Sequence, residues 1–287
     1  MLQPATLQLL RFHFSFFLLP VYLFALAQVP DINTADAVLI FFILHFLVYP
    51  SSNGYNSYMD RDEGSIGGIE KPMAPTRQLF QVSIAMDIAA LFLSFLVSSI
   101  FLICVLAYIL ASRAYSYRGI RLKKYPWLGY FTVVFFQGAV TFFMVYHGSS
   151  QQKTIEVPVL PIISASLLMG SFYPLTQIYQ HKADLKDGVK TISYLMGYRG
   201  TFVFTAVVYG LAMGSLAFYF NKTGHFGNFF LLATLLFPVL VYFIYWAIQV
   251  WKDTSKADFK HTMRMNVLAS CCSNAAFLTL LILSHFE

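Results

Sequence analysis

Nine apolar stretches divide this chain of 287 residues into alternating hydrophobic and polar segments. A helix needs about 20 mostly apolar residues to cross the hydrocarbon core of a bilayer. Stretches close to that length occupy residues 9–28, 35–50, 79–96, 98–114, 128–146, 156–173, 200–219, 228–250 and 266–285. Only 11% of the residues are charged, whereas about 25% are charged in a soluble domain. The sequence therefore predicts an all-α integral membrane protein, in which residues 1–287 form a single domain of nine transmembrane helices.

The positive charges are distributed unevenly between the loops. Seventeen of the 19 Lys and Arg residues lie at the N-terminus or around the loops that follow the second, fourth, sixth and eighth stretches, and only Lys153 and Lys222 lie on the opposite side. Cytoplasmic loops of membrane proteins are rich in Lys and Arg. We therefore expect a protein of the bacterial inner membrane with its N-terminus in the cytoplasm and its C-terminus outside. This distribution accounts for the net charge of +6, so nucleic acid is not an expected partner.

One polar pattern occurs twice, at a constant offset of 124 residues. Residues 49–64 read YPSSNGYNSYMDRDEG, and residues 173–188 read YPLTQIYQHKADLKDG. Five of the sixteen positions are identical, and three more keep an amide or an acid. An internal repeat of this kind predicts two copies of one structural unit. Because the copies follow the second and sixth apolar stretches, both are expected on the cytoplasmic side.

The polar residues of each copy are spaced so that they would share one face of a helix. At positions i, i+3, i+7 and i+10, the first copy has Asn53, Asn56, Asp60 and Glu63, and the second has Gln177, Gln180, Asp184 and Asp187. Carboxylate and amide oxygens suit Mg²⁺, which proteins usually hold with one or two carboxylates and substrate phosphates. Each stripe could instead be the solvated end of a helix, but its duplication favours a binding site. The predicted metal ligands are Asn56, Asp60 and Glu63 in the first copy and Gln180, Asp184 and Asp187 in the second.

A strongly basic segment lies between the two copies. Residues 112–129, SRAYSYRGIRLKKYPWLG, contain five Lys and Arg residues interleaved with tyrosines. Such a loop is commonly attracted to anionic lipid headgroups. Its position between two acidic motifs favours a second interpretation, in which it neutralises a polyanionic ligand.

Two ionisable residues lie inside apolar stretches. An ionised Asp87 in the third stretch would cost a few kcal/mol in a membrane. It therefore marks either a functional site or a carboxyl group that is neutral or reaches the interface. We interpret His45 in the second stretch as a hydrogen-bonded core residue.

These motifs resemble those of the UbiA superfamily of intramembrane aromatic prenyltransferases, and the resemblance covers most of the chain. The run NSYMDRD, which starts at Asn56, is similar to the family's N-D-x-x-D-x-D motif, with Ser57 for its first Asp. Lys71-Pro72 and Arg77 resemble the family's Arg-Pro-x-x-x-Gly-Arg segment. Residues 115–129, YSYRGIRLKKYPWLG, resemble its Y-S-x-x-x-x-R-L-K-x-x-P-x-L-G loop, and residues 183–191, ADLKDGVKT, resemble D-D-L-K-x-G-x-K-S/T in its second motif.

The chain departs from the family at two motif positions. Gly64 stands where the first motif often has an Asp, and Gln180 stands where the second motif usually opens with Asp. An amide still offers an oxygen to Mg²⁺, but it neutralises one charge less.

The resemblance implies a bundle of nine helices around a central cavity. It also implies Mg²⁺-dependent transfer of an isoprenyl group from an isoprenyl diphosphate to a lipophilic, electron-rich acceptor, with membrane lipids as further partners. By the same resemblance, Asn56, Asp60, Gln180 and Asp184 would hold Mg²⁺. The catalytic residues would be Asp60, Asp184, Arg121 and Lys123, and the substrate-binding residues would be Arg11, Lys71, Tyr115, Arg118 and Lys190.

The incomplete motifs leave open a second function, that of a catalytically weakened or inactive lipid-binding relative. A transporter is disfavoured because transporters place polar residues and broken helices near the bilayer midplane, whereas this chain places them at one surface. A CDP-alcohol phosphotransferase is disfavoured because the sequence lacks the Asp-Gly…Ala-Arg…Gly-x-x-x-Asp-x-x-x-Asp run of that class.

Overall fold

The computed structural model describes residues 1–61 and 63–286, and within these ranges the chain is helical and has no strands. Eight helical runs in the described residues are long and apolar enough to cross a membrane. A helix pair at the N-terminus, bent by 41°, supplies a ninth. The predicted nine-helix membrane fold is therefore confirmed.

The first five spans include the first copy of the repeat. Span 1 contains α1 (Pro4–Leu10), the 3-10 segment η1 (Phe12–Phe17) and α2 (Leu19–Leu26). Span 2 runs through α3 (Thr34–Phe42), the π-helix η2 (Ile43–Val48) and α4 (Tyr49–Asp60). Spans 3 and 4 are α5 (Arg77–Val97) and α6 (Ser99–Ser116). Span 5 runs through α7 (Pro126–Val133), the π-helix η4 (Val134–Val140) and α8 (Thr141–Ser149), after the short 3-10 turn η3 (Leu122–Lys124).

The last four spans include the second copy. Span 6 contains α9 (Val159–Gln177), the 3-10 turn η5 (Ile178–Gln180) and α10 (His181–Lys186). Spans 7 and 8 are α11 (Ile192–Lys222) and α12 (Phe226–Lys252), and the 3-10 turn η6 (Thr254–Lys256) leads to span 9, α13 (Phe259–Phe286).

Proline and serine set several helix boundaries. Helices α1 and α7 each follow an extended residue and have a proline in their first turn, where its missing N–H group costs no hydrogen bond. Ser98 separates α5 from α6, because its hydroxyl accepts a hydrogen bond from the Phe101 amide at 3.0 Å and so caps α6. Spans 3 and 4 are therefore distinct helices.

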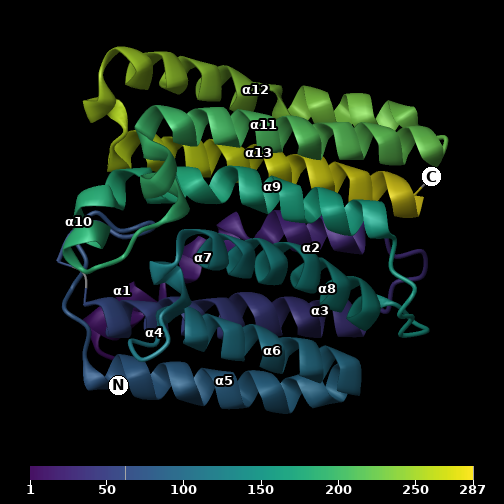
Figure 1. Ribbon diagram of the computed structural model, residues 1–287. Helices are drawn as coiled ribbons and strands as arrows, with labels where there is room; N and C mark the ends of the chain where they lie inside the picture. Colours follow the sequence, from purple (N-terminus) through teal and green to yellow (C-terminus); the bar gives the residue numbers. More distant parts are fainter. Residues whose placement is uncertain (62, 287) are drawn as a thin grey trace.

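The helices pack side by side, and the cytoplasmic ends expected from the sequence lie together. Figure 1 shows α4, α10 and the connection between α6 and α7 at one end of the bundle. Helix α13 packs against α2 as well as α12, and α9 packs against α11. Because the first and last spans are neighbours, the bundle closes on itself around its interior.

Apolar side chains fill the bundle and also cover its outside. The main core includes Phe24, Phe101 and Phe142, and a smaller cluster surrounds Trp246. Large apolar residues such as Phe92 and Phe95 on α5 are exposed. In a membrane protein such faces contact lipid tails.

The orientation of the bundle is tested by placing cysteines on its two ends. Lys124 and Lys222 are both exposed, so Lys124→Cys and Lys222→Cys are suitable labelling sites. In a background with Cys104, Cys271 and Cys272 replaced by serine, we expect a membrane-impermeant maleimide to label Lys124→Cys only from the cytoplasmic side and Lys222→Cys only from outside. Labelling of both variants from one side would contradict the nine-span orientation.

Candidate active site

The two copies of the repeat meet at one cavity, which we call the acidic chamber. Its volume is about 150 Å³, and Asn56, Asp60, Gln180 and Asp184 all line it. The acidic residues thus come from two segments that lie 124 residues apart in the sequence. The two predicted stripes face one shared space.

In the first copy, only part of the predicted stripe reaches the chamber. Asn56 and Asp60 are four residues apart in the last turns of α4 and share its inner face. Arg61 then adopts a left-handed conformation with φ of 54° and ends the helix. The helical spacing does not continue to Glu63, which lies exposed in the following loop and does not line the chamber. Glu63 is therefore not among the ligands that we propose for the chamber, and Asp62 lies outside the described residues.

The second copy is built differently. The helix changes from α9 to the 3-10 turn η5 at Ile178, and η5 ends at Gln180, where α10 with Asp184 follows. The Gln180 amide donates a hydrogen bond to the Ser65 carbonyl at 3.2 Å, which fixes this side chain against the loop that follows α4. Asp187 follows α10, does not line the chamber, and pairs with Arg121 instead. Asp187 is likewise not among the ligands that we propose for the chamber.

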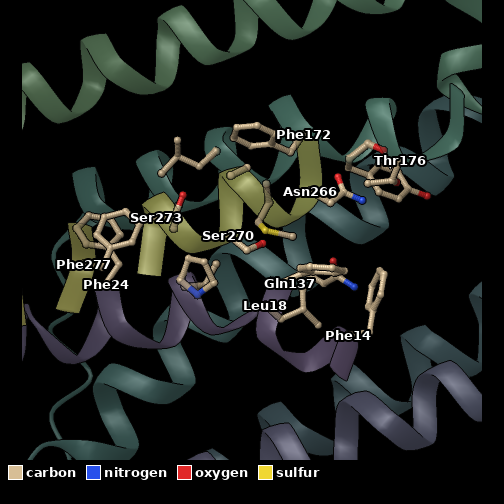
Figure 2. A pocket seen from close by; sticks show the side chains of 18 residues that line it. Phe14, Leu18, Phe24, Gln137, Phe172, Thr176, Asn266, Ser270, Ser273 and Phe277 are labelled. Atoms are coloured by element: carbon tan, nitrogen blue, oxygen red, sulfur yellow. Dashed lines mark hydrogen bonds between the residues drawn. The ribbon is translucent and has the colours of Figure 1, made fainter. Parts of the chain in front are cut away.

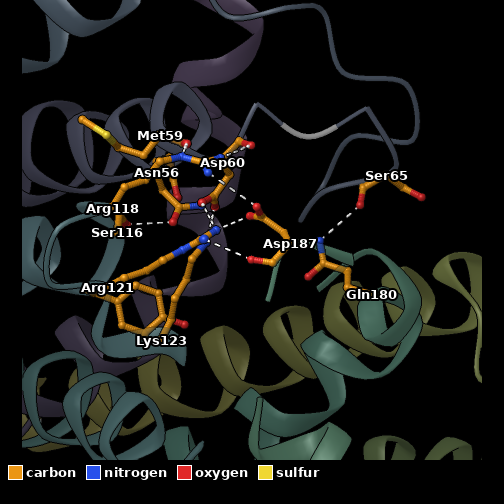
Figure 3. Close-up of polar contacts among 12 residues, drawn as sticks. Asn56, Met59, Asp60, Ser65, Ser116, Arg118, Arg121, Lys123, Gln180 and Asp187 are labelled. Carbon is orange, nitrogen blue, oxygen red and sulfur yellow. Dashed lines mark hydrogen bonds and ion pairs between the residues drawn. The ribbon is translucent and has the colours of Figure 1, made fainter. Parts of the chain in front are cut away.

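Two cations of the basic segment form ion pairs with Asp60 and Asp187, as Figure 3 shows. Lys123 forms an ion pair with Asp60, and Arg121 Nη2 lies 3.7 Å from Asp60 Oδ1. Arg121 also pairs with the Asp187 carboxylate and donates to its backbone carbonyl at 3.1 Å. The Asp60 side chain is only 5% exposed, so these contacts operate where solvent screening is weak.

Arg11 and Tyr115 also lie at the site, as the resemblance implied. Arg11 has φ of 50° between α1 and η1, is 6% exposed, and lines the acidic chamber. Its guanidinium donates to the carbonyls of Gly67 and Asn53, both at 3.3 Å. A side chain at Gly67 would collide with Phe14, so this glycine permits the close approach. The Tyr115 hydroxyl is hydrogen-bonded to the hydroxyl of Tyr173.

Three predicted substrate-binding residues lie elsewhere. Arg118 is half-exposed and donates to the carbonyls of Met59 and Asp60 at 2.7 and 3.2 Å. It therefore caps the C-terminus of α4, where a cation is favourable. Lys71 and Lys190 are exposed and do not line the acidic chamber.

The residues of the acidic chamber fit Mg²⁺. Among the described residues, no three or more His, Cys, Asp or Glu side chains are grouped so that they could hold a metal ion by themselves. Two carboxylates and four side-chain amides of the described residues line the chamber, and Mg²⁺ is normally held by one or two carboxylates together with substrate phosphates and waters. Asp60 Oδ1 is buried and accepts no hydrogen bond from the part of the chain that the structure describes. A buried carboxylate oxygen that accepts no hydrogen bond is suited to coordinating a cation.

Two further cavities adjoin the acidic chamber. The aromatic chamber, shown in Figure 2, has a volume of about 180 Å³ and is walled mainly by Phe14, Phe17, Phe24, Phe172 and Phe277. The polar chamber, of about 170 Å³, lies between α4, α6, α7 and η4 and is lined by Ser52, Asn53, Ser112, Ser116, Thr132 and Gln137, among others. Tyr173 lines all three cavities, so they converge at this residue.

The sequence analysis did not identify several of these lining residues. Tyr173 is the first residue of the second repeat, and its twin Tyr49 is buried in the core, so the repeat alone gave it no distinct role. Asn266 and Ser270 lie four residues apart on α13 and both face the aromatic chamber. That spacing of polar residues within an apolar span is the signal that could have revealed them.

Asp87 and His45, the two ionisable residues singled out inside the apolar stretches, both contact side chains of the bundle. Asp87 is 6% exposed and forms an ion pair with Arg113 of α6. His45 packs against the rings of Tyr22, Phe41 and Tyr49. The interpretation of His45 as a core residue holds, but its Nε2 atom has no hydrogen-bond partner among the described residues.

Comparisons with known proteins agree with this architecture. The UbiA prenyltransferase family model matches residues 16–268. A UbiA homolog from Archaeoglobus fulgidus bound to DMAPP and Mg²⁺ has a similar structure, with a TM-score of 0.71, 19% identity, and 96% of this chain and 99% of the homolog covered. The same homolog bound to GPP and Mg²⁺ gives a TM-score of 0.69 at 19% identity and the same coverage. The apo UbiA homolog from Aeropyrum pernix gives 0.68 at 16% identity, covering 94% and 98%. Comparison with curated proteins gives no match.

Proposed function

The chain belongs to the UbiA prenyltransferase family, and from that premise we propose that it transfers an isoprenyl group from an isoprenyl diphosphate to an aromatic or other electron-rich lipophilic acceptor, with Mg²⁺ as cofactor. The observation that carries the proposal is the acidic chamber itself. Carboxylates and amides from both repeats face one space that also contains Arg11 and Lys123. Such a mixture of metal-binding oxygens and cations suits a diphosphate and its metal.

Asn56, Asp60, Gln180 and Asp184 would hold the Mg²⁺. When bound, the ion supplies positive charge to the diphosphate oxygens. Like the A. fulgidus homolog, whose structures contain DMAPP or GPP with Mg²⁺, this chain would take an allylic diphosphate as donor.

The cations of the chamber would stabilise the leaving group. In the transfer, the allylic C–O bond breaks and its electron pair leaves with the diphosphate, while a carbon of the acceptor bonds to the allylic carbon and loses its proton. Lys123, Arg121 and Arg11 lie at the acidic chamber or beside Asp60, where their charges favour the additional negative charge of the departing diphosphate. The neighbouring aromatic chamber offers apolar walls to the isoprenyl chain and excludes water from the allylic cation.

The proposal is tested by following pyrophosphate. Purified protein in lipid nanodiscs is mixed with labelled isoprenyl diphosphates of increasing chain length, with and without Mg²⁺. We expect Mg²⁺-dependent release of pyrophosphate from at least one donor. Absence of release from every donor would contradict the proposal.

The pyrophosphate assay also tests the second candidate function, in which the chain is a catalytically weakened or inactive lipid-binding relative. One observation favours that alternative: Lys123 and Arg121 already neutralise Asp60, and Gln180 brings one negative charge less than an Asp. An inactive relative would bind the donors without releasing pyrophosphate, and equilibrium binding of a non-hydrolysable isoprenyl diphosphonate separates these two cases.

Gln180 is expected to limit the affinity for Mg²⁺. Gln180→Asp restores one negative charge in the chamber, so the Mg²⁺ concentration at half-maximal pyrophosphate release should fall about tenfold, corresponding to about 1.4 kcal/mol of added attraction. Gln180→Ala removes the oxygen without adding charge and should raise that concentration. An unchanged Mg²⁺ requirement in both variants would show that residue 180 is not a metal ligand.

A further inference from the structure

The polar chamber contains two buried hydrogen-bond donors that no described residue satisfies. The hydroxyl of Ser52 and the side-chain nitrogen of Asn53 are inaccessible to solvent and have no partner in the described part of the chain. Both residues lie on α4, one turn before Asn56, and both line the polar chamber. Leaving a buried donor without an acceptor is unfavourable, so these groups indicate a ligand with oxygens that accept hydrogen bonds.

The aromatic chamber and the polar chamber differ in the charge and polarity of their lining, so they suit different ligands. The described residues that line the aromatic chamber include no charged side chain, and its far end is closed by Phe24 and Phe277, whose rings stack at 4.6 Å. It extends along α13 from Asn266 to Phe277, a distance of ~16 Å at the usual helical rise. This long apolar space suits an isoprenyl chain.

The polar chamber has the opposite character. Arg11 is the one charged residue among the described residues that line it, and no carboxylate does. Several of its other polar groups already have partners: Ser116 donates to Asn56 at 2.8 Å, and Thr132 donates to the Leu128 carbonyl at 2.7 Å. The two buried lining groups without a partner among the described residues, the Ser52 hydroxyl and the Asn53 side-chain nitrogen, can both donate, and they lie in a chamber that Arg11 also lines. This environment suits a compact, oxygen-bearing ring and not a hydrocarbon chain.

Tyr173 connects these spaces. It lines the acidic, aromatic and polar chambers and shares a hydroxyl hydrogen bond with Tyr115, which lines the acidic and polar chambers. A donor with its diphosphate in the acidic chamber and its chain in the aromatic chamber would place its allylic carbon near this junction. A ring held in the third cavity, the polar chamber, would then lie next to that allylic carbon.

We propose that Ser52 and Asn53 are the residues that select the acceptor, by donating hydrogen bonds to an oxygen substituent of a ring held in the polar chamber. This inference rests on the proposed prenyl transfer, because it names the place of the second substrate. The two residues do not touch the donor in this arrangement, so they act on acceptor recognition and not on breaking the allylic C–O bond.

The test uses rings that differ in one substituent. Phenol is compared with hydroquinone and para-hydroxybenzoate, which carry a second oxygen group opposite the hydroxyl, and product formation is followed with a saturating allylic diphosphate. The native chain should prefer hydroquinone or para-hydroxybenzoate, which carry the second oxygen group, over phenol in kcat/KM. In a Ser52→Ala/Asn53→Leu double variant this preference should fall about tenfold, the effect of losing one good hydrogen bond or two weaker ones. The KM for the acceptor should rise more than the KM for the donor.

Thr132→Val is the matched control. It also removes a hydroxyl that lines the polar chamber, but this hydroxyl is already bonded to its own helix. The preference should therefore stay within about twofold. The thermal unfolding midpoint of the double variant should be retained, because the Ser52 hydroxyl and the Asn53 side-chain nitrogen bond to no described residue.

The outcomes separate the two proposals. No pyrophosphate release from any donor would overturn the proposed function. Product formation with an unchanged ring preference in the double variant, or an equal loss in Thr132→Val, would overturn the role of Ser52 and Asn53 alone. Prenylation of neither hydroquinone nor para-hydroxybenzoate, despite Mg²⁺-dependent pyrophosphate release, would also overturn it.

Discussion

Asp184→Asn is expected to lower kcat for pyrophosphate release by ~100-fold or more. The carboxylate faces the acidic chamber opposite the first repeat, and its loss removes one of the two negative charges there that can hold a divalent cation. A group that acts on the charge developing in the transition state typically contributes a factor of about 10²–10³. The measurement is the rate of pyrophosphate release at saturating donor and Mg²⁺.

Glu63→Gln provides the matched control for this prediction. It makes the same change from acid to amide within the other repeat, but Glu63 is exposed and lies outside the chamber. Its kcat should remain within about twofold of the native value, as for a typical exposed surface position. A loss in Glu63→Gln comparable to that in Asp184→Asn would mean that the exposed loop closes over the chamber during turnover.

Asp60→Asn should lose activity too, but it is a less selective test. Asp60 neutralises Lys123 and Arg121 in a place that is almost fully buried. Removing one partner of a buried ion pair leaves an uncompensated charge, which is strongly destabilising. For this reason Asp184→Asn isolates the chemistry better than Asp60→Asn does.

Asp87→Asn is expected to lower the free energy of unfolding by about 3–5 kcal/mol, the cost of breaking a buried ion pair from one side. Arg113 Nε lies 3.0 Å from Asp87 Oδ2, and the Ser51 hydroxyl lies 2.5 Å from Asp87 Oδ1. The Arg113 guanidinium also lies 4.2 Å from the ring centre of Tyr55. Asp87 thereby ties α5 and α6 to α4, the helix that carries Asn56 and Asp60. The measurement is thermal or denaturant unfolding in a fixed detergent.

A double variant distinguishes the loss of the Asp87–Arg113 ion pair from the cost of leaving the Arg113 charge buried without its partner. Asp87→Leu/Arg113→Met replaces both charges with apolar groups, and it should recover most of the stability lost in Asp87→Asn. Asp36→Asn is the control on the opposite face: its pair with Lys153, at 2.5 Å, is more exposed, so its loss should cost no more than about 1 kcal/mol. If Asp87→Asn proved as mild as Asp36→Asn, the Asp87–Arg113 pair would not be what holds α4 in place.

The sequence by itself determined the membrane architecture. Hydrophobicity over about 20 residues is a local property, and it predicts spans whatever their neighbours are. The repeat also predicted that Asn56, Asp60, Gln180 and Asp184 would face one space, because equivalent segments on one side of a bundle tend to occupy equivalent places. All four line the acidic chamber.

Only the tertiary structure decided where the helical spacing ends and which charges pair. Glu63 fits the stripe by its position in the sequence, but Arg61 turns left-handed and the stripe stops at Asp60. Arg118 and Arg121 are three residues apart in one basic loop, yet one caps α4 and the other reaches Asp60 and Asp187. Whether Asp87 was a functional charge or a structural one depended on Arg113 of another helix. Such contacts join residues far apart in the sequence, so local patterns could not reveal them. The convergence of the three chambers at Tyr173 also depends on residues from distant segments.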